Sequence, residues 1–540
     1  MKTFRLFSMA ALALMMAACS NEDSALENAA PAQQQGAMKF KATLAAPGSG
    51  ATTRTTYTEV TEGDDAGKIK VAWKAGDQIY LYDLDNGAEC TATVGTPAAS
   101  GSATISGTFD YDVEAGENIT ATYPASAKND DFNAKFASQA GTIAYIQDNL
   151  DYRKGTSTIS VDGTDATLAT ALEMESQIAI WKLTLTTDGS TALSATKVTI
   201  KNGSTVIAAT TTITATSTVY LALNLKSGNI TGADITIEAT VGSDTYTYSK
   251  SGVSLAKGNY YQSTLKMAKV VDYSAEINVP AGDHWYIGGS GTYNITIGEG
   301  ATVTIGSLLQ MQYASIICSG NATIILADGT TTYIFDGRIK AGPEGTTLTI
   351  KGNTGELNIQ AGNSSGAAIG ASDGDACGNI VIEGGVITAT GSNGAGIGGA
   401  SNAKCGDITI SGGTVTATGS YGAGIGASTA ECGDITISGG TITATGGDCA
   451  AGIGSGYSDT GWCGNITISG GTVTATGGSM SAGIGTGEEN GCYDITIKST
   501  VTHVTATKGS GASASIGAAN DGDSECGTVT IEDPSKVTQN

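Results

Sequence analysis

The chain has 540 residues, of which 40% are hydrophobic and 14% charged, so it can form several domains and is too apolar for a disordered protein. Its formal net charge of -24 at pH 7 argues against nucleic acid as a partner, because an acidic surface repels phosphate backbones. Gly is abundant (77 residues) without a Gly-X-Y period, which excludes collagen, and the richness in Thr, Val and Ile indicates an all-β protein.

The first residues have the pattern of an export signal. Lys2 and Arg5 precede an apolar run over 6–18 that is too short to span a membrane, so residues 1–18 are predicted to be a secretory signal peptide. The run ends in "MAAC", which resembles a bacterial lipobox and implies cleavage before Cys19 and lipidation of that cysteine. Residues 19–36 are polar and acidic, as expected of a flexible tether. They also resemble the surface-export signal of outer-membrane lipoproteins, which implies a lipid anchor in the cell outer membrane and exposure at the surface.

Residues 37–268 are predicted to form two β-sandwich subdomains, over 37–165 and 166–268. Apolar and polar residues alternate in "KIKVAW" (68–73), "QIYLYD" (78–83), "AIWKLTLTT" (179–187) and "VYLALNLK" (219–226). Turn signals such as "KAGD", "TTDGS" and "KSGN" separate these segments. Short alternating strands divided by turns are typical of sandwiches.

The same half resembles the fimbrillin family in "MKFKATL" from Met38, "VAWKAGDQIYLYD" from Val71, "TYPAS" from Thr122 and "LAKGNYYQSTLKM" from Leu255. The resemblance implies a fimbrial subunit or related surface protein with two sandwich subdomains, and assembly by donor-strand exchange. In polymerising members an arginine-specific protease cuts near the first strand. Arg54, in "ATTRTT", matches that position; the alternative is that Thr-Arg-Thr is only the polar start of a strand.

The second half repeats one unit. "IG" pairs begin at spacings of 28, 28, 28, 31 and 32 residues, at Ile369, Ile397, Ile425, Ile453, Ile484 and Ile516. Each unit, such as "CGDITISGGTVTATGSYGAGIG" (405–426), contains three short strands, two glycine corners and a loop, which predicts a coil of parallel β-helix. Regular coils are expected over 343–540 and irregular lead-in coils over 269–342. Ile435 and Ile437, with Val415 or Ile442, are expected to point inward.

This region also resembles "GNITISGGTITATGG…AGIGGG" modules of bacterial surface proteins, some of which are related to β-helical carbohydrate-binding domains. The resemblance implies the β-helix fold and a role in binding a glycan or a host protein.

Catalytic motifs are weak throughout. "GAGIGG" (394–399) satisfies the G-x-G-x-x-G pattern of nucleotide sites, yet it recurs in degenerate form in every coil and no amphipathic helix follows it. "RIK" (338–340) echoes a polygalacturonase motif without the paired aspartates and the histidine that such an enzyme needs. The chain is therefore expected not to be an enzyme and to need no cofactor, with calcium as the one cation considered.

Six cysteines recur with the repeat, at Cys377, Cys405, Cys432, Cys463, Cys492 and Cys526. Stacked coils place equivalent residues about 4.8 Å apart in single file, which does not make a tetrahedral metal site. The ladder is structural in either of two forms, disulfides between neighbours or free stacked thiols.

Acidic residues near these cysteines have two interpretations. Asx residues stand two positions after five of the cysteines, and a "DGD" stretch covers 373–375. Oxygen ligands on adjacent coils suit calcium, and the candidate ligands are Asp373, Asp375, Asp407, Asp434 and Asp494. The alternative is a ladder of Asx side chains that hydrogen-bond the backbone at a corner.

A candidate ligand face follows from the outward positions of the repeated strand. Its threonines are Thr388, Thr390, Thr416, Thr418, Thr443, Thr445, Thr474 and Thr476, and the aromatic candidates in nearby loops are Tyr421, Tyr457, Trp462 and Tyr493. A regular hydroxyl lattice suits an extended polysaccharide, although threonine is also an ordinary residue on the solvent side of a strand. The sequence predicts a surface-exposed, lipid-anchored adhesin for a glycan or a host protein. The alternative is a tip or accessory subunit of a pilus, with other fimbrial subunits as partners.

Overall fold

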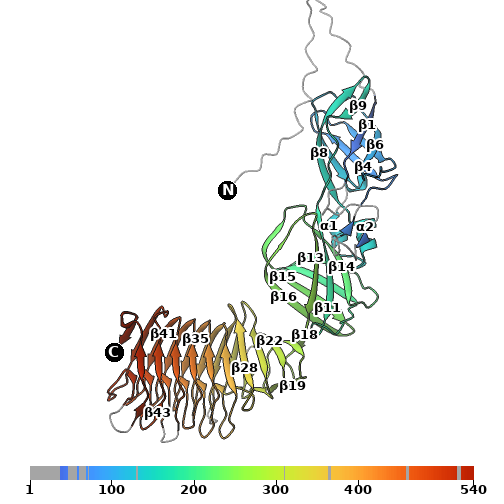
Figure 1. The fold of residues 1–540 in the computed structure, drawn as a ribbon. Helices are drawn as coiled ribbons and strands as arrows, with labels where there is room; N and C mark the ends of the chain where they lie inside the picture. The colour runs from blue at the N-terminus through green and yellow to red at the C-terminus, as the bar shows by residue number, and fades with distance from the viewer. Residues whose placement is uncertain are drawn as a thin grey trace, which may run out of the picture.

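A computed structural model describes residues 37–46, 58–59, 69–70, 72–128, 132–308, 311–362, 366–457, 461–519 and 524–540. The chain passes in order through a β-barrel, a β-sandwich and a β-helix, so the predicted all-β architecture is confirmed (Figure 1). Within the described ranges, no helix has the length and apolarity needed to cross a membrane. The predicted lipidation at Cys19 and cleavage at Arg54 fall outside these ranges.

The first body is a closed barrel rather than an open sandwich. Its strands follow the order β10-β8-β7-β4-β5-β6-β1-β9, and β8 also pairs with β9, which joins the two ends of the sheet. Alternate residues face a core in which the rings of Phe40 and Phe109 meet edge to face at 5.5 Å. The strands are β1 (Met38–Leu44), β4 (Gln78–Asp83), β5 (Glu89–Val94), β6 (Ala103–Phe109), β7 (Asn118–Tyr123), β8 (Arg153–Asp162), β9 (Asp165–Leu168) and β10 (Glu175–Ser176), with β2 (Thr58–Glu59) and β3 (Ile69–Lys70) as a separate pair.

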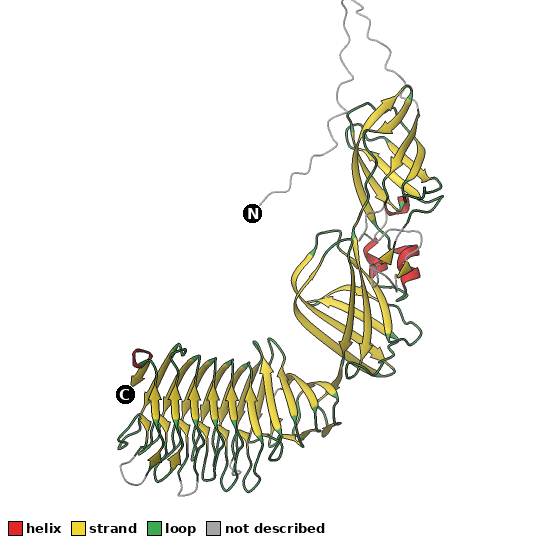
Figure 2. Cartoon of the chain, in the orientation of Figure 1, coloured by secondary structure: helices red, strands yellow, loops and turns green. Residues whose placement is uncertain are grey.

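The barrel extends beyond the predicted boundary at residue 165, because β9 and β10 both return to pair with β8. A 3-10 helix (Ala125–Lys128) and two short helices, α1 (Phe132–Phe136) and α2 (Ile143–Asn149), lie between the barrel and the sandwich (Figure 2). Ile146 and Leu150 pack against Ile178 of the sandwich. The buried Gln139 side chain donates to the Ala222 carbonyl and accepts from its N–H, both at 2.8 Å, so this segment is fixed to the second body.

The second body is a sandwich of two sheets. Strands β14-β11-β17 form one sheet, and β13-β12-β15-β16 begin the other. The two inner faces enclose a core that includes Leu183, Ile200 and Ile237, all fully buried. The strands are β11 (Ile178–Thr186), β12 (Lys197–Asn202), β13 (Thr205–Ala209), β14 (Thr218–Asn224), β15 (Ile230–Val241), β16 (Asp244–Leu255) and β17 (Tyr260–Lys266).

One sheet continues from the sandwich into the β-helix. Strand β18 (Ala268–Asp272) pairs antiparallel with β16 and parallel with β20 (His284–Gly289), which belongs to the first coil. The result is a single 15-stranded sheet from β13 to β48 (Val529–Ile531). Lys269 reinforces the junction, since its Nζ lies 2.8 Å from the Asp244 carboxylate and 5.6 Å from the Trp285 ring centre. The two bodies are therefore joined by backbone hydrogen bonds and not only by a linker.

The junction also holds a histidine that favours its neutral form. The Nε2 atom of His284 lies 3.1 Å from the Thr304 hydroxyl, and Nδ1 is buried without a hydrogen-bond partner. Burial, and then the nearby positive charge of Lys266, lower the pKa of His284 from 6.5 to about 4.

Acid is therefore expected to loosen this junction. Between pH 6.5 and pH 4 the unfolded chain binds the proton and the folded chain does not, so stability falls as pH falls through this window. The protection factors of β18 and β20 amides in hydrogen exchange, which correct for the slower intrinsic exchange in acid, should fall in wild type from pH 7 to pH 4.5, and less in His284→Gln. His503→Gln, which changes the other histidine, is the control and should keep the wild-type response. An equal fall of the protection factors in His284→Gln would contradict the prediction.

Three parallel sheets make up the β-helix, and each regular coil contributes one strand to each sheet. The continuous sheet, here called the Ile-Thr-Ile sheet, contains β20, β22 (Ala301–Leu308), β25 (Ala322–Leu326), β28 (Thr347–Gly352), β31 (Asn379–Ile382), β34 (Ile408–Ile410), β37 (Ile435–Ile437), β40 (Ile466–Ile468), β44 (Ile495–Ile497) and β48 (Val529–Ile531).

The second is the threonine sheet, which contains β23 (Met311–Gln312), β26 (Thr331–Phe335), β29 (Glu356–Gln360), β32 (Val386–Thr390), β35 (Thr414–Thr418), β38 (Thr441–Thr445), β41 (Thr472–Thr476), β45 (His503–Thr507) and β49 (Val537–Gln539). The third is the Ile-Gly sheet, with β19 (Ile277–Val279), β21 (Ile295–Ile297), β24 (Ile316–Cys318), β27 (Ile339–Lys340), β30 (Ile369–Gly370), β33 (Ile397–Gly398), β36 (Ile425–Gly426), β39 (Ile453–Gly454), β42 (Ile484–Gly485) and β46 (Ile516–Gly517). Outside these sheets, β43 (Gly491–Cys492) pairs with β47 (Glu525–Cys526), and a 3-10 helix covers Pro534–Lys536.

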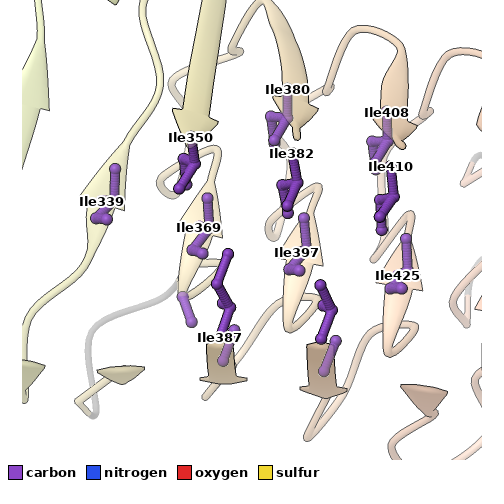
Figure 3. Packing of buried hydrophobic residues seen from close by; sticks show 14 of the residues in the cluster. Ile339, Ile350, Ile369, Ile380, Ile382, Ile387, Ile397, Ile408, Ile410 and Ile425 are labelled. Carbon is purple, nitrogen blue, oxygen red and sulfur yellow. The ribbon is translucent and has the colours of Figure 1, made fainter. Parts of the chain in front are cut away.

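Stacked isoleucines hold the coils together (Figure 3). Ile408, Ile435 and Ile466 pair in register on successive coils and are fully buried, as are Ile437 and Val415, so the predicted inward positions are confirmed. Each such side chain contributes about 1.5–3 kcal/mol by leaving water. Because every coil repeats the same ladder, the outward positions repeat in register too, and these create the candidate site.

Candidate functional site

Three rows of side chains cover the outer surface of the threonine sheet. In β35 the residues Thr414, Thr416 and Thr418 point outward while Val415 and Ala417 are buried. The same alternation recurs in the neighbouring strands, and the eight predicted threonines pair in register across β32, β35, β38 and β41. Neighbouring hydroxyls are thus about 4.8 Å apart across coils and roughly 6.6 Å apart along a strand. The structure brings all eight together on one lattice.

These hydroxyls are not used by the fold. In the described part of the chain, none of the eight predicted threonine side chains makes a hydrogen bond. Each hydroxyl can donate one hydrogen bond and accept two. The lattice therefore offers donors and acceptors in a fixed pattern to a ligand that carries hydroxyls of its own.

The rows continue into earlier coils with a different chemistry that the sequence analysis missed. Tyr333 and Phe335 of β26 are in register with Asn358 and Gln360 of β29, which lead into Thr388 and Thr390. The two rings are 36% and 40% exposed, their centres are 5.9 Å apart and their planes differ by 4°. Tyr313, 74% exposed, follows β23 and donates its backbone N–H to the Phe335 carbonyl. We call Tyr313, Tyr333 and Phe335 the aromatic platform.

The amides beside the platform are also available. Within the described residues, the side chains of Asn358 and Gln360 make no hydrogen bond. The alignment of "TTYIFDG" and "GELNIQAG" with "VITATGS" could have revealed this row. The coil of "TTYIFDG", however, has Ile339-Lys340 in place of the Ile-Gly pair, and neither segment follows a repeat cysteine.

The whole face is nearly neutral although the chain is strongly acidic. Among the outward residues of strands β26 to β45, Glu356 is the only acidic residue and His503 the only basic one. Glu356 accepts a hydrogen bond from Thr331 at 3.0 Å, so part of its carboxylate is engaged within the sheet. A neutral face with hydroxyl, amide and aromatic groups suits an uncharged polar ligand better than an ionic one.

The predicted loop aromatics lie elsewhere. Tyr421 is in the loop between the threonine and Ile-Gly sheets, whereas Tyr457, Trp462 and Tyr493 are in connections from the Ile-Gly sheet to the Ile-Thr-Ile sheet. Trp462 and Tyr493 contact each other at 5.8 Å between ring centres with planes tilted by 55°. Tyr421, Tyr457 and Tyr493 are 61%, 46% and 59% exposed. They are therefore separate from the hydroxyl lattice and do not extend it.

The Asx residues form a hydrogen-bonded ladder. Oδ1 of Asp407 accepts the N–H of Asp434 at 2.9 Å, and Oδ1 of Asp434 accepts the N–H of Asn465 at 2.7 Å. Asn379 and Asp494 take the same role at their coils. Of the two interpretations of these residues, the structure thus shows the ladder of Asx side chains. One carboxylate or amide oxygen of each residue accepts a backbone N–H of the next coil at the corner.

Calcium has no assembled site in the described residues. No group of three or more His, Cys, Asp or Glu side chains there could hold a metal ion. Asp375 pairs with Lys340 at 2.7 Å, which lowers the pKa of its carboxyl, and Asp373 is exposed. The five predicted ligands are thus divided between a loop and the corner ladder, and the calcium site stays a prediction.

The repeat cysteines form a single file of free thiols at the same corner. Cys377, Cys405, Cys432, Cys463 and Cys492 pair as successive bridges and are all at most 5% exposed. Hydrogen bonds from the thiols of Cys405 and Cys463 lower the pKa of Cys432 to about 5. A shallow pocket of about 300 Å³ borders the first three of these cysteines. The ion pair between Lys404 and Glu431, at 2.6 Å, lies beside it.

Comparison with known families supports the β-helix. A family model described as a Beta helix repeat matches residues 380–401, 408–429, 435–457 and 466–488, which are four successive coils. No curated protein matches the chain.

Solved structures resemble the N-terminal half. A proposed cell adhesion protein from Bacteroides uniformis ATCC 8492 is 18% identical, with 43% of this chain and 96% of that chain covered and a TM-score of 0.27. A fimbrial assembly protein from Parabacteroides distasonis ATCC 8503 is 14% identical over 44% and 94% of the two chains, with a TM-score of 0.24. A fimbrial protein from Bacteroides ovatus ATCC 8483 is 13% identical over 43% and 49%, also with a TM-score of 0.24. The chain thus resembles fimbrial and cell adhesion structures in its first half and β-helix repeat proteins in its second.

Proposed function

We propose that this chain is a non-enzymatic, lipid-anchored adhesin of the cell surface that binds an extended, uncharged glycan along the threonine sheet. The observation that carries the proposal is the outer surface of that sheet, where free hydroxyls, free amides and the rings of Tyr333 and Phe335 share two straight rows. Sugar hydroxyls match the hydroxyl and amide rows, and the apolar face of a sugar ring matches an exposed aromatic ring.

The rest of the molecule suits presentation of such a face. The predicted lipid anchor is at the start of the chain, and the barrel and the sandwich separate it from the β-helix. The continuous sheet through β16, β18 and β20 fixes the direction of the β-helix relative to the sandwich. A glycan bound across many coils would meet one rigid surface, which reduces the entropy lost on binding.

Binding of the mature full-length protein to insoluble polysaccharides tests the proposal. Neutral polysaccharides such as cellulose and chitin should retain the protein equally with calcium and with chelator, and polyuronates should retain it less because the chain is anionic. The double variant Tyr333→Ala/Phe335→Ala and the double variant Thr416→Val/Thr443→Val should each weaken retention about tenfold.

The matched control changes the same residue type on another face. Thr409 and Thr436 are the outward residues of β34 and β37 in the Ile-Thr-Ile sheet, where they form a single row. Thr409→Val/Thr436→Val should leave retention unchanged. Retention that requires calcium would move the site to the Asx corner. If no polysaccharide retains the protein, the proposed glycan binding is contradicted.

A pilus tip subunit is the second candidate function. Strand β1 lies between β6 and β9 and pairs with β6 over Met38–Leu44. Its release would open a slot in the barrel for a strand of another subunit. Arg54 follows β1 in the chain, so cleavage there would separate β1 from the remaining strands. Higher oligomers after treatment with an arginine-specific protease, absent in Arg54→Gln, would favour this candidate.

A further inference from the structure

Two cysteines at the end of the ladder are placed for a covalent bond. Strands β43 and β47 pair in parallel with Cys492 opposite Cys526, and their Sγ atoms are 3.1 Å apart. Parallel neighbours at about 4.8 Å fall within the range of 4.4–6.8 Å that Cα atoms of a disulfide normally span. We propose that Cys492 and Cys526 form a disulfide that staples the last coil of the β-helix to the coil before it.

The pair of Cys492 and Cys526 differs from the other repeat cysteines because one of its members is partly exposed to solvent. Cys526 is half-buried, whereas the five preceding members of the ladder are at most 5% exposed. An oxidant should therefore reach Cys526 more readily than the five buried cysteines. Among the described cysteines, Cys449 is the other half-buried one, and the carboxylate of Glu488 lies beside it.

The local hydrogen bond prepares Cys526 as the attacking sulfur. The Cys492 thiol donates to Cys526, and this bond lowers the pKa of Cys526 and raises that of Cys492. The thiolate is the reactive form of cysteine. Cys526 should therefore react first and Cys492 second.

The exchange is balanced with a disulfide as oxidant, either a low-molecular-weight disulfide or the disulfide of an oxidoreductase. The Cys526 thiolate attacks one sulfur of the oxidant and expels the other as a thiolate, which leaves a mixed disulfide. Cys492 transfers its proton to the expelled thiolate and attacks Sγ of Cys526, which expels the second thiolate. The second thiolate takes up the proton that Cys526 lost on ionisation, so two cysteine thiols are oxidised to one disulfide and the oxidant is reduced to two thiols.

The bond would secure the last coil that the structure describes. Strands β48 and β49 are at the edges of their sheets, so each has a neighbouring strand on one side only. Terminal coils of a repeat protein open most easily because they contact one neighbour instead of two. A disulfide between Cys492 and Cys526 closes a ring across one whole coil and opposes this opening.

Oxidised glutathione applied to the folded full-length protein tests the inference. Non-reducing peptide mapping should recover a peptide pair linked through Cys492 and Cys526, while the other ladder cysteines stay free. In Cys492→Ser the expected product is a stable glutathione adduct on Cys526. Limited proteolysis after β47 should be about tenfold slower in the oxidised wild type than in the reduced protein.

A control variant distinguishes the Cys492–Cys526 disulfide from unspecific oxidation of cysteines. Cys449→Ser should form the same linked peptide as wild type, because Cys449 has no part in the pair. A lasting glutathione adduct on Cys526 in wild type would overturn the inference, as would a disulfide from Cys526 to any other cysteine. Slower proteolysis that also occurs in oxidised Cys492→Ser would overturn the assigned stabilising role.

Discussion

Replacement of Gly426 by alanine is expected to destabilise the β-helix by at least about 3 kcal/mol, because the position excludes any side chain. Gly426 has a φ of +132°, a conformation that other residues rarely adopt, and it pairs with Gly454 of the next coil. A Cβ there would lie 2.1 Å from the Gly454 carbonyl oxygen, which accepts the Ala427 N–H at 2.9 Å. The substitution would therefore push two coils apart and break a bond between them.

Urea unfolding and hydrogen exchange of β36 and β39 measure this effect. Gly374→Ala is the matched control, since Gly374 also has a positive φ (+73°) but has open space where a Cβ would be. The control should cost only about 1–2 kcal/mol, from backbone strain alone. Equal losses in the two variants would show that the contact with the neighbouring coil is unimportant.

Replacement of Arg153 by methionine is expected to cost about 3–5 kcal/mol of barrel stability. Arg153 is fully buried, its Nε lies 3.2 Å from Asp151, and its Nη1 donates to the Met174 carbonyl at 2.9 Å. Without the guanidinium, the Asp151 charge would remain in the protein interior without its buried counter-ion. Urea unfolding of the variant measures the loss.

Two comparisons make this second prediction specific. The double variant Asp151→Asn/Arg153→Met should recover most of the loss, because the uncompensated charge is gone. Lys404→Ala breaks the ion pair with Glu431, whose side chains are 57% and 54% exposed, and should cost less than about 1 kcal/mol. A single variant Arg153→Met as stable as Lys404→Ala would contradict the prediction.

The β-helix could be predicted from sequence because its information is local and repeated. Each coil carries the same alternation and the same glycine corners, so the inward side of Ile435 and the in-register stacking of Thr416 on Thr443 follow from period alone. The sequence allows the Asx residues to be either calcium ligands or acceptors of backbone hydrogen bonds. The structure shows that Asp407 and Asp434 each accept a hydrogen bond from the backbone of the next coil.

The aromatic platform and the barrel closure depend on pairing that no local pattern reveals. Tyr333 joins the row of Thr388 only through the register of β29, and the early coils have different lengths from the later ones. Likewise, β8 closes the barrel by pairing with both β7 and β9, which a strand pattern alone does not specify. The return of β10 to β8, beyond residue 165, is likewise a matter of pairing that no local pattern specifies.

Because the coils are nearly identical, the length of the β-helix can change by whole coils. A unit of about 28 residues begins and ends at equivalent positions, so gain or loss of one unit preserves every ladder on both sides. Each added unit lengthens the β-helix by about 4.8 Å and adds one strand, with its three outward side chains, to the threonine sheet. Recombination between the matching repeats of the gene would therefore change the length of the β-helix and the number of ligand contacts together, one coil at a time.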